Sequence, residues 1–496
     1  MADMDIDPTN QEEEEEEDDE VQLDPGDAEE VIELQNDSAA HFDGHSDSIL
    51  CIAQHPIHSS IVATGGVDDL AYIFDSTPAE KPVLPSSWGS NPIAADNAER
   101  ESLKPLVKLE GHKDSVSAIT FTLPNGEFLV TTGLDGQIRV YQDKSPELTG
   151  TQYIFLASAQ ETEDINWLTP CPNPTYPNTF ALGAKDGSVW IYTINPSDPT
   201  TPLTIAQAFY LHTGESTAGA WNPTGDLLAS VSDDSALLVF DAFGLYSAAG
   251  LANPVGSQTV VALNAQDQRF AVEGGLYCVA IAPGGAFVAV GGANGTVKII
   301  GLPRLPDTTT TPSSSKSKSK SKARATANTS TAGQAGQILA SLSAQGNSPD
   351  DSIETLSFSS PQFNLLAAGC VDGSVAVFDT QHAFRLRRMI SDAHEGYAVV
   401  KVEFVRDSSV LTSVGYDGVV RRWETRGGMM GASGSGSGSA SGSGAGGLMG
   451  EWKGHPPVDE EGQGGGILGF VQGGGERIVT AGNEGVGLIF EAGKRS

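Results

Sequence analysis

Short runs in which apolar and polar side chains alternate occur through most of the chain, and this pattern predicts β-strands. In the clearest unit, apolar positions recur at every second residue from Val116 to Phe121. A Pro-Asn-Gly turn follows, and two further strands are expected at 127–132 and 137–141, separated by a Gly-Leu-Asp-Gly turn. Three short strands cannot bury both of their faces, so we expect the unit to stack on copies of itself.

The second turn of this unit, with the strand that follows it, occurs eight times in the chain. The turn residues are Asp68, Asp135, Asp186, Asp234, Asn294, Asp372, Asp417 and Glu484. The shortest intervals between them, 45 and 48 residues, approach the period of about 40–45 residues of a WD40 blade. The pattern predicts an all-β WD40 β-propeller with eight blades. Seven blades remain an alternative, because the copies at Asn294 and Glu484 depart from the usual turn residue.

Three segments of biased composition account for the longer intervals. Residues 76–105 are rich in proline, residues 303–336 contain a Lys/Ser-rich stretch, and residues 427–447 are almost entirely Gly, Ser and Ala. We interpret all three as insertions, the first between the third and fourth strands of blade one. The Lys/Ser-rich stretch could serve nuclear import, could bind an acidic partner, or could be a solvated loop.

Charge is distributed unevenly along the chain, whose formal net charge is −36. Residues 1–47 hold 20 acidic side chains and no Lys or Arg. Residues 1–36 are therefore predicted to be a disordered acidic tail, and residues 37–496 the propeller. The remaining 449 residues still carry a net charge of −16. This excess argues against direct nucleic-acid binding and favours a basic partner, unless it serves solubility alone.

The short run at residues 37–42 precedes the first Gly-His pair. In a propeller such a run belongs to the outer edge of the preceding blade, so we expect it to close the ring by pairing with residues 486–491.

No apolar run of about 18 residues occurs, no secretory leader is visible, and the four cysteines are far apart. These features predict a protein without a membrane span in a reducing compartment, the cytoplasm, with the nucleus as a second location.

The histidines of the Gly-His pairs and the turn acids of the same blades invite a catalytic or metal-binding interpretation. The sets are His45 with Asp68, His112 with Asp135, and His455 with Glu484. We favour a structural role, in which each pair hydrogen-bonds within its blade through a hydroxyl such as that of Thr64 or Thr132. No zinc spacing, phosphate-binding loop or nucleophile elbow stands out. We therefore expect no cofactor, no metal and no enzymatic activity.

Acidic residues recur where the chain enters the innermost strand of a blade, in at least five blades. These positions should surround the mouth of the central channel, where Lys113 and Lys185 are the only clear opposing charges, and Trp221 nearby should belong to the core. The candidate partner-binding residues are Asp47, Asp114, Glu163, Asp164, Glu215, Asp233, Asp350, Asp351, Glu395 and Tyr397. Tyr397 could stack on an arginine of a bound peptide. The alternative is that all of them are ordinary solvated turn residues.

Several stretches resemble the angio-associated migratory cell protein family. They are FDGHSDSILCIAQHP, EDINWL at 163–168, and DDSIETLSFSSPQFNLLAAGCVDGSVAVFD at 350–379. Fungal members of that family are ribosome-assembly chaperones dedicated to the large-subunit protein L-ten. The resemblance implies an eight-bladed propeller that captures the basic N-terminal segment of newly made L-ten and supports its loading onto the pre-60S particle. We expect the chain to be a monomer. A general WD40 scaffold in signalling or cell migration is the alternative that animal members suggest.

Overall fold

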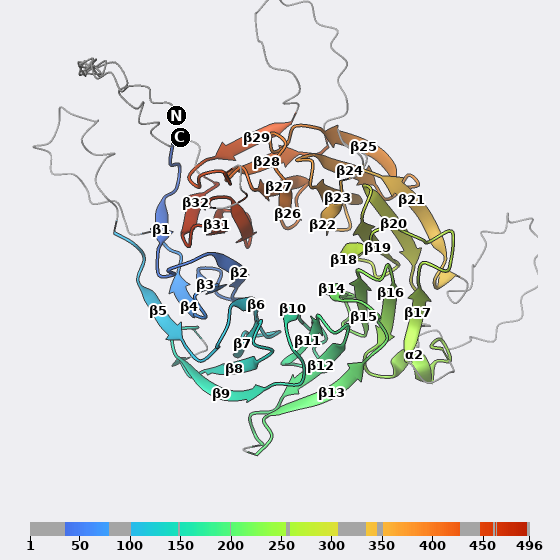
Figure 1. The fold of residues 1–496 in the computed structure, drawn as a ribbon, viewed down its shortest axis with the longest axis horizontal. Helices are drawn as coiled ribbons and strands as arrows, with labels where there is room; N and C mark the ends of the chain where they lie inside the picture. Colours follow the sequence, from blue (N-terminus) through green and yellow to red (C-terminus); the bar gives the residue numbers. More distant parts are fainter. Residues whose placement is uncertain are drawn as a thin grey trace, which may run out of the picture. The chain divides into compact units, whose positions relative to one another are not determined.

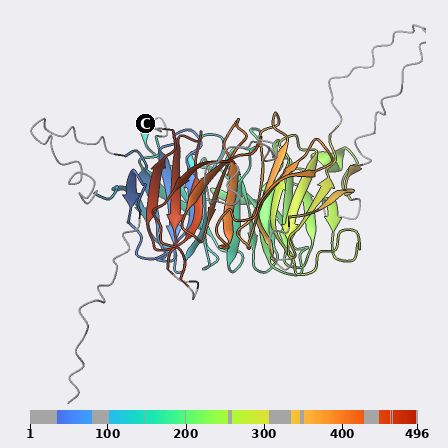
Figure 2. The ribbon, with the colours of Figure 1, turned by 90° about the horizontal axis from the view of Figure 1, so that it is seen from above.

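The predicted strands form eight four-stranded antiparallel sheets, arranged as blades around a central opening (Figure 1). The computed structural model describes residues 35–493 except 79–100, 147–148, 199, 254–257, 306–333, 345–350, 427–446, 460–461 and 463. Seen edge-on, the strands run between the two faces of the ring (Figure 2). The eight-bladed propeller is therefore confirmed, and the seven-bladed alternative is excluded.

In each of the first four blades, the strands follow one another in chain order from the innermost outward. Blade one holds β2 (Ile49–Gln54), β3 (Ile61–Gly66), β4 (Ala71–Asp75) and β5 (Pro105–Leu109). Blade two holds β6 (Val116–Phe121), β7 (Phe128–Gly133), β8 (Ile138–Asp143) and β9 (Tyr153–Ala159). Blade three holds β10 (Ile165–Pro170), β11 (Thr179–Ala184), β12 (Val189–Ile194) and β13 (Leu203–Phe209). Blade four holds β14 (Ser216–Trp221), β15 (Leu227–Ser232), β16 (Leu237–Asp241) and β17 (Thr259–Leu263), with the short helix α2 (Leu245–Ala248) after β16.

The other four blades are also built from the innermost strand outward. Blade five holds β18 (Leu276–Ile281), β19 (Phe287–Gly292), β20 (Thr296–Gly301) and β21 (Ile338–Ser343). Blade six holds β22 (Ile353–Phe358), β23 (Leu365–Cys370), β24 (Val375–Asp379) and β25 (Arg385–Ile390). Blade seven holds β26 (Val399–Phe404), β27 (Val410–Gly415), β28 (Val420–Glu424) and β29 (Leu448–Trp452). Blade eight holds β30 (Ile467–Val471), β31 (Arg477–Gly482), β32 (Gly487–Glu491) and, on its outer edge, β1 (Ala40–Phe42).

The strands form where the alternation predicts them, with shifts of one or two residues at some ends. β6 has the expected bounds, whereas β7 and β8 each begin one residue later than expected. All eight turn residues lie between the second and third strands of a blade. The segments expected as insertions join the third strand to the fourth in blades one, five and seven, and most of their residues lie outside the described part, as do residues 1–34 of the expected tail.

The hydrophobic core lies between the blades. The second strands are its centre, because every residue of β3, β7 and β11 is buried. Each apolar cluster joins two neighbouring blades; one of them packs Ile61 and Ala63 of blade one against Ile119 and Leu129 of blade two. Trp221 is buried in the cluster between blades three and four, as predicted.

Within the described ranges, no helix has the length and apolar character needed to cross a bilayer.

The two ends of the propeller meet in blade eight. β1 pairs antiparallel with β32, with Ala40 opposite Ile489 and Phe42 opposite Gly487, and the two strands lie side by side in Figure 1. Phe42 is fully buried and stacks on Phe74 of blade one, with 4.3 Å between the ring centroids. The prediction that the first strand closes the ring is confirmed.

Candidate functional site

One face of the ring collects the starts of all eight innermost strands. Because neighbouring strands in each blade are antiparallel, the turns between second and third strands lie at this same end. We call this side the mouth face, the segments that precede the innermost strands the leading loops, and the opposite side the rear face. The topology thus places the described leading-loop candidates and the turn residue Asp233 on one face, as expected.

Each turn on the mouth face lies against the leading loop of the next blade. Gly187 of blade three has a φ of +82°, and a Cβ on it would lie 2.5 Å from the carbonyl oxygen of Gly214 in the next leading loop. Gly485 of blade eight has a φ of +84°, and its Cβ would lie 2.8 Å from the carbonyl oxygen of Asp47. The same close approach recurs at Gly136, Gly373 and Gly418. Glycine at these turns therefore allows the turns and leading loops to form a rim around the channel mouth.

We expect Gly187→Ala to lower the free energy of unfolding by about 1–3 kcal/mol, because the new methyl group meets both an unfavourable φ and a neighbouring carbonyl. Urea denaturation measures this loss. Gly244→Ala is the matched control, since its φ is +78° but nothing lies within 4 Å of the added Cβ. Equal losses in the two variants would show that contact between the turn and the next leading loop contributes nothing.

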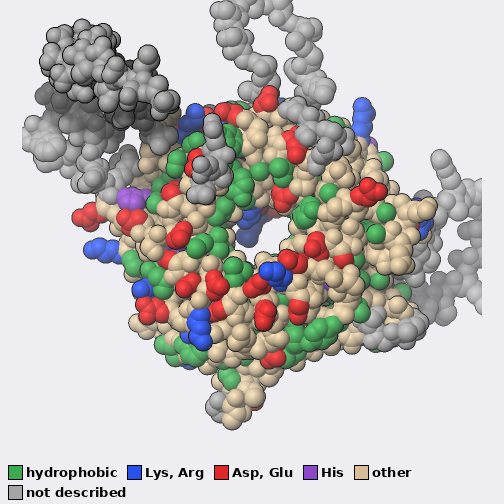
Figure 3. Space-filling view, in the orientation of Figure 1, with side chains coloured by type: hydrophobic (Ala, Val, Ile, Leu, Met, Phe, Trp, Pro, Cys, Tyr) green, Lys and Arg blue, Asp and Glu red, His purple; other side chains and the backbone are tan. Residues whose placement is uncertain are grey.

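The mouth face carries nine of the ten candidate residues, and Asp350 lies outside the described part of the chain. The exposed candidates are Asp47, Asp114, Glu163, Asp233, Glu395 and Tyr397, and the half-buried ones are Asp164, Glu215 and Asp351. Figure 3 shows one face of the ring, with Asp and Glu side chains gathered along the margin of the central opening that Figure 1 colours blue to green. The arrangement offers a basic chain several carboxylates at one opening.

Lys185 lies among three of these carboxylates. Its Nζ atom is 2.8 Å from Oδ2 of Asp164, and its backbone N–H donates to the carbonyl of the same residue at 3.0 Å. The hydrogen bond with Asp164, its charge, and the charges of Glu215 and Glu163 raise the pKa of Lys185. The acidic rim is therefore partly compensated between blades three and four.

A second compensating cation was missed by the sequence interpretation. Arg421 of β28 is 5% exposed, and its Nη2 atom donates to Oε1 of Glu395 at 3.0 Å. The same guanidinium contacts Asp417 and donates from Nε to Glu451 at 2.9 Å. Glu395 is thus a neutralised member of the rim, and Lys113 and Lys185 are not its only opposing charges. The sequence signal that could have revealed Arg421 was its position four residues after the turn residue Asp417, with which it forms an ion pair.

The histidine sets form hydrogen bonds within their blades, as predicted. Nδ1 of His45 lies 2.9 Å from Asp68, and its Nε2 lies 3.0 Å from the Thr64 hydroxyl. Burial lowers the pKa of His45 and of His112, which favours the neutral imidazole; in that form Nδ1 donates to the carboxylate and Nε2 accepts from the hydroxyl. In the described chain, no group of three or more His, Cys, Asp or Glu side chains is placed to hold a metal ion.

The sequence interpretation was wrong about one hydroxyl and missed two histidines. In blade two the partner of His112 is Thr131, at 2.8 Å, whereas Thr132 donates to a backbone carbonyl, because adjacent strand residues point to opposite faces. His212 and His394 form equivalent sets with Ser230 and Ser413. The 19-residue spacing from His394 to its hydroxyl partner, the same as in blades one and two, could have revealed it.

Glu354 is a further carboxylate at the channel that the sequence interpretation missed. It is the second residue of β22, where the register skips from Ile353 to Thr355, and it is exposed between two buried neighbours. The equivalent bulge positions of the other innermost strands carry uncharged residues, namely Leu50, Ser117, Asn166, Thr217, Tyr277, Val400 and Leu468. Glu354 therefore extends the acidic character of the mouth into the channel.

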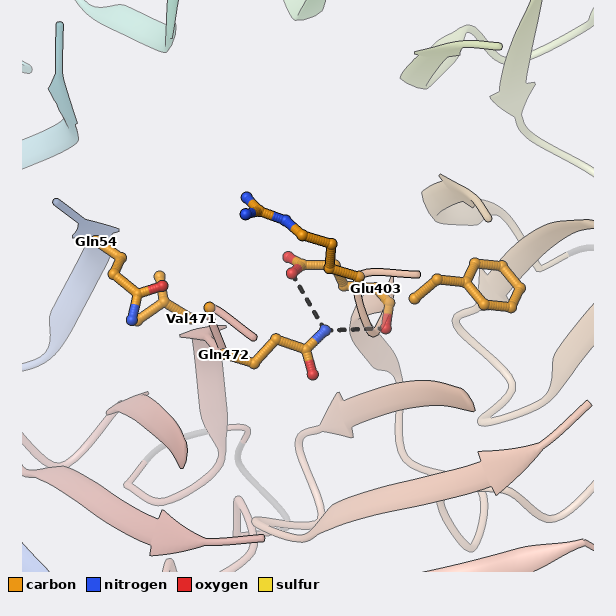
Figure 4. A pocket seen from close by; sticks show the side chains of 7 residues that line it. Gln54, Glu403, Val471 and Gln472 are labelled. Carbon is orange, nitrogen blue, oxygen red and sulfur yellow. Dashed lines mark hydrogen bonds between the residues drawn. The ribbon is translucent and has the colours of Figure 1, made fainter. Parts of the chain in front are cut away.

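The rear face is hollowed where blades seven, eight and one meet (Figure 4). The hollow has a volume of about 350 Å³ and is lined by Gln54, Glu403, Phe404, Arg406, Val471, Gln472 and Gly473. The amide of Gln472 donates to the backbone carbonyl and the carboxylate of Glu403, at 3.2 and 3.1 Å. Gln472 and Glu403 thus satisfy each other across the seam between two blades, which indicates a structural role.

Comparisons with known proteins agree with this architecture. The WD domain, G-beta repeat family matches residues 36–75, 103–142, 204–241 and 268–300. The crystal structure of Chaetomium thermophilum Sqt1 bound to the N-terminus of ribosomal protein L10 is 47% identical, covers 92% of this chain and 100% of that one, and has a TM-score of 0.74. Ribosome assembly protein SQT1 of Saccharomyces cerevisiae is 27% identical over 94% of this chain and 89% of its own length. The human angio-associated migratory cell protein is 23% identical over 80% of this chain and 73% of its own length.

Proposed function

Because the chain belongs to the Sqt1 family of ribosome assembly proteins, we propose that it is a dedicated chaperone of newly made ribosomal protein L10. It binds the basic N-terminal segment of L10 on the mouth face and supports the loading of L10 onto the pre-60S subunit. The observation that carries this proposal is that a relative 47% identical over nearly the whole chain was crystallised with the L10 N-terminus. We further propose that the chain acts in the cytoplasm, as a monomer, by binding alone and without enzymatic activity.

The charge of the mouth face supplies a physical reason for this choice of partner. A ribosomal protein is rich in Lys and Arg, and off the ribosome its cationic segments lack the RNA that neutralises them. One exposed ion pair contributes only about 0–1 kcal/mol, but several carboxylates that converge on one segment add up and also accelerate encounter. The rigid rim keeps those carboxylates together before the client arrives, which lowers the entropic cost of binding.

We expect the affinity for a peptide of the L10 N-terminal segment to fall steeply as salt rises, because the screening length shrinks from about 10 Å at 0.1 M to about 3 Å at 1 M. Isothermal calorimetry of the full chain at several salt concentrations measures this dependence. A salt-independent affinity would show that apolar contacts, rather than the acidic rim, hold the client.

A general scaffold in signalling or cell migration is the second candidate, favoured by the name of the human relative. The two functions predict different sets of proteins bound to the chain while those proteins are still being translated. Mass spectrometry of proteins captured co-translationally at low salt should yield one dominant basic client for the chaperone. Several unrelated partners would support the scaffold.

A further inference from the structure

We propose that Lys185 is a built-in counterion of the mouth face, which occupies a position meant for a client cation and thereby limits how tightly the client is held. The inference rests on the proposed function, since it concerns the same acidic rim. It assigns a specificity-determining role to a residue whose charge is opposite to that of the candidate carboxylates.

The backbone of Lys185 is held in place, whereas its side-chain ammonium group can move. Its N–H is bonded to the carbonyl of Asp164, and the turn is pressed against the next leading loop through Gly187. The side chain of Lys185 is nevertheless 57% exposed, and that of Asp164 is 30% exposed. The ammonium group can therefore leave Asp164 without any change in the surrounding fold, because a lysine stem is long and flexible.

Lys185 differs in this respect from the other cations near the rim. Of the two ion pairs that described residues form with candidate carboxylates, one uses Arg421, whose side chain is 5% exposed, and the other uses Lys185. Arg421 is tied to three carboxylates and cannot withdraw. Lys185 is thus the one cation in the described rim that is both paired with a candidate carboxylate and free to exchange.

The consequence for binding follows from charge balance. When a client Arg or Lys approaches Asp164, Glu163 and Glu215, one ion pair must be broken for each new one that forms at Asp164. The net gain there is small, and the positive charge of Lys185 also weakens the attraction from the two neighbouring carboxylates. The lysine therefore disfavours retention of unrelated cationic chains and keeps the client releasable to the ribosome.

The test compares Lys185→Gln with Lys108→Gln in the full chain, using calorimetry with a peptide of the L10 N-terminal segment at about 0.1 M salt. Lys108 is the matched control, because it also pairs with a carboxylate, that of Glu110 at 2.8 Å, but on the outermost strand of blade one. We expect Lys185→Gln to bind about 3–10-fold more tightly than the unmodified chain, and Lys108→Gln to bind within about twofold of it. The gain should vanish at about 1 M salt.

A second variant identifies the carboxylate responsible. Adding Asp164→Asn to Lys185→Gln should cancel most of the gain, and asparagine tolerates the φ of +42° at this position. Equal affinities of Lys185→Gln and Lys108→Gln, or weaker binding by Lys185→Gln, would overturn the counterion role while leaving the chaperone function intact. Failure of the unmodified chain to bind the L10 segment would overturn both proposals.

Discussion

Reversing Asp114, Glu163 and Asp351 to lysine should abolish binding of the L10 N-terminal segment and leave the propeller folded. The three residues lie in the leading loops of blades two, three and six, and none forms an ion pair with another described residue. The change removes three attractive charges and adds three repulsive ones around one opening. We expect a loss of at least about 100-fold in affinity, measured by calorimetry, because several contacts of up to about 1 kcal/mol each are inverted together.

A matched triple variant separates the site from the overall charge. Asp75, Asp407 and Glu476 are also exposed, but they lie at strand ends and turns of the rear face. Their reversal to lysine changes the net charge by the same amount, so it should leave affinity within a few-fold of the unmodified chain. Equal losses from the two triple variants would mean that general charge, and not the mouth face, attracts the client. An unchanged affinity of the mouth-face variant would place the client elsewhere.

Phe42→Ala should lower the free energy of unfolding by about 3–5 kcal/mol, the usual cost of truncating a buried phenylalanine. The loss should be large because β1 has only three residues, and Phe42 is the side chain that packs it against blade one. Its ring stacks on Phe74 and meets the edge of Tyr72, with centroids 5.6 Å apart. Urea denaturation gives the magnitude, and hydrogen exchange at the amides of β32 reports whether the outer edge of blade eight opens first.

Phe155→Ala provides the control for this truncation. Phe155 lies on the outermost strand of blade two and is 49% exposed, so the same substitution removes few buried contacts. We expect it to cost well under half as much as Phe42→Ala. Similar costs for the two variants would mean that β1 does not close the ring energetically.

The blades were predictable from the sequence because their signals are local. Period-two alternation and a polar turn repeat within each unit, whatever the rest of the chain does, and glycine follows the turn residue in every blade except one and four, where Asp69 and Ser235 stand there. The two doubtful blades keep the requirements of the turn in another form. Asn294 tolerates its φ of +58°, and Glu484 still reaches His455 with its carboxylate. The eightfold repeat is therefore maintained by residues that meet the same backbone and hydrogen-bonding requirements, even where the residue type differs.

The charge pattern of the rim was only partly predictable, because it depends on contacts between segments. Lys185 and Asp164 are 21 residues apart, and Arg421 and Glu395 are 26 residues apart; each pair meets only when a third strand or turn folds against a leading loop. Glu354 was overlooked for another reason. The candidates were sought among the residues that precede the innermost strands, whereas Glu354 is the second residue of β22, exposed between the buried Ile353 and Thr355.

The three connections between third and fourth strands that carry the Pro-rich, Lys/Ser-rich and Gly/Ser-rich segments share one geometric property. In an antiparallel blade a third strand ends, and a fourth begins, on the side away from the start of the first strand. All three segments are therefore attached to strands at the rear face of the propeller. Evolution could lengthen, shorten or recharge them at those attachment points without rebuilding the opening on the mouth face.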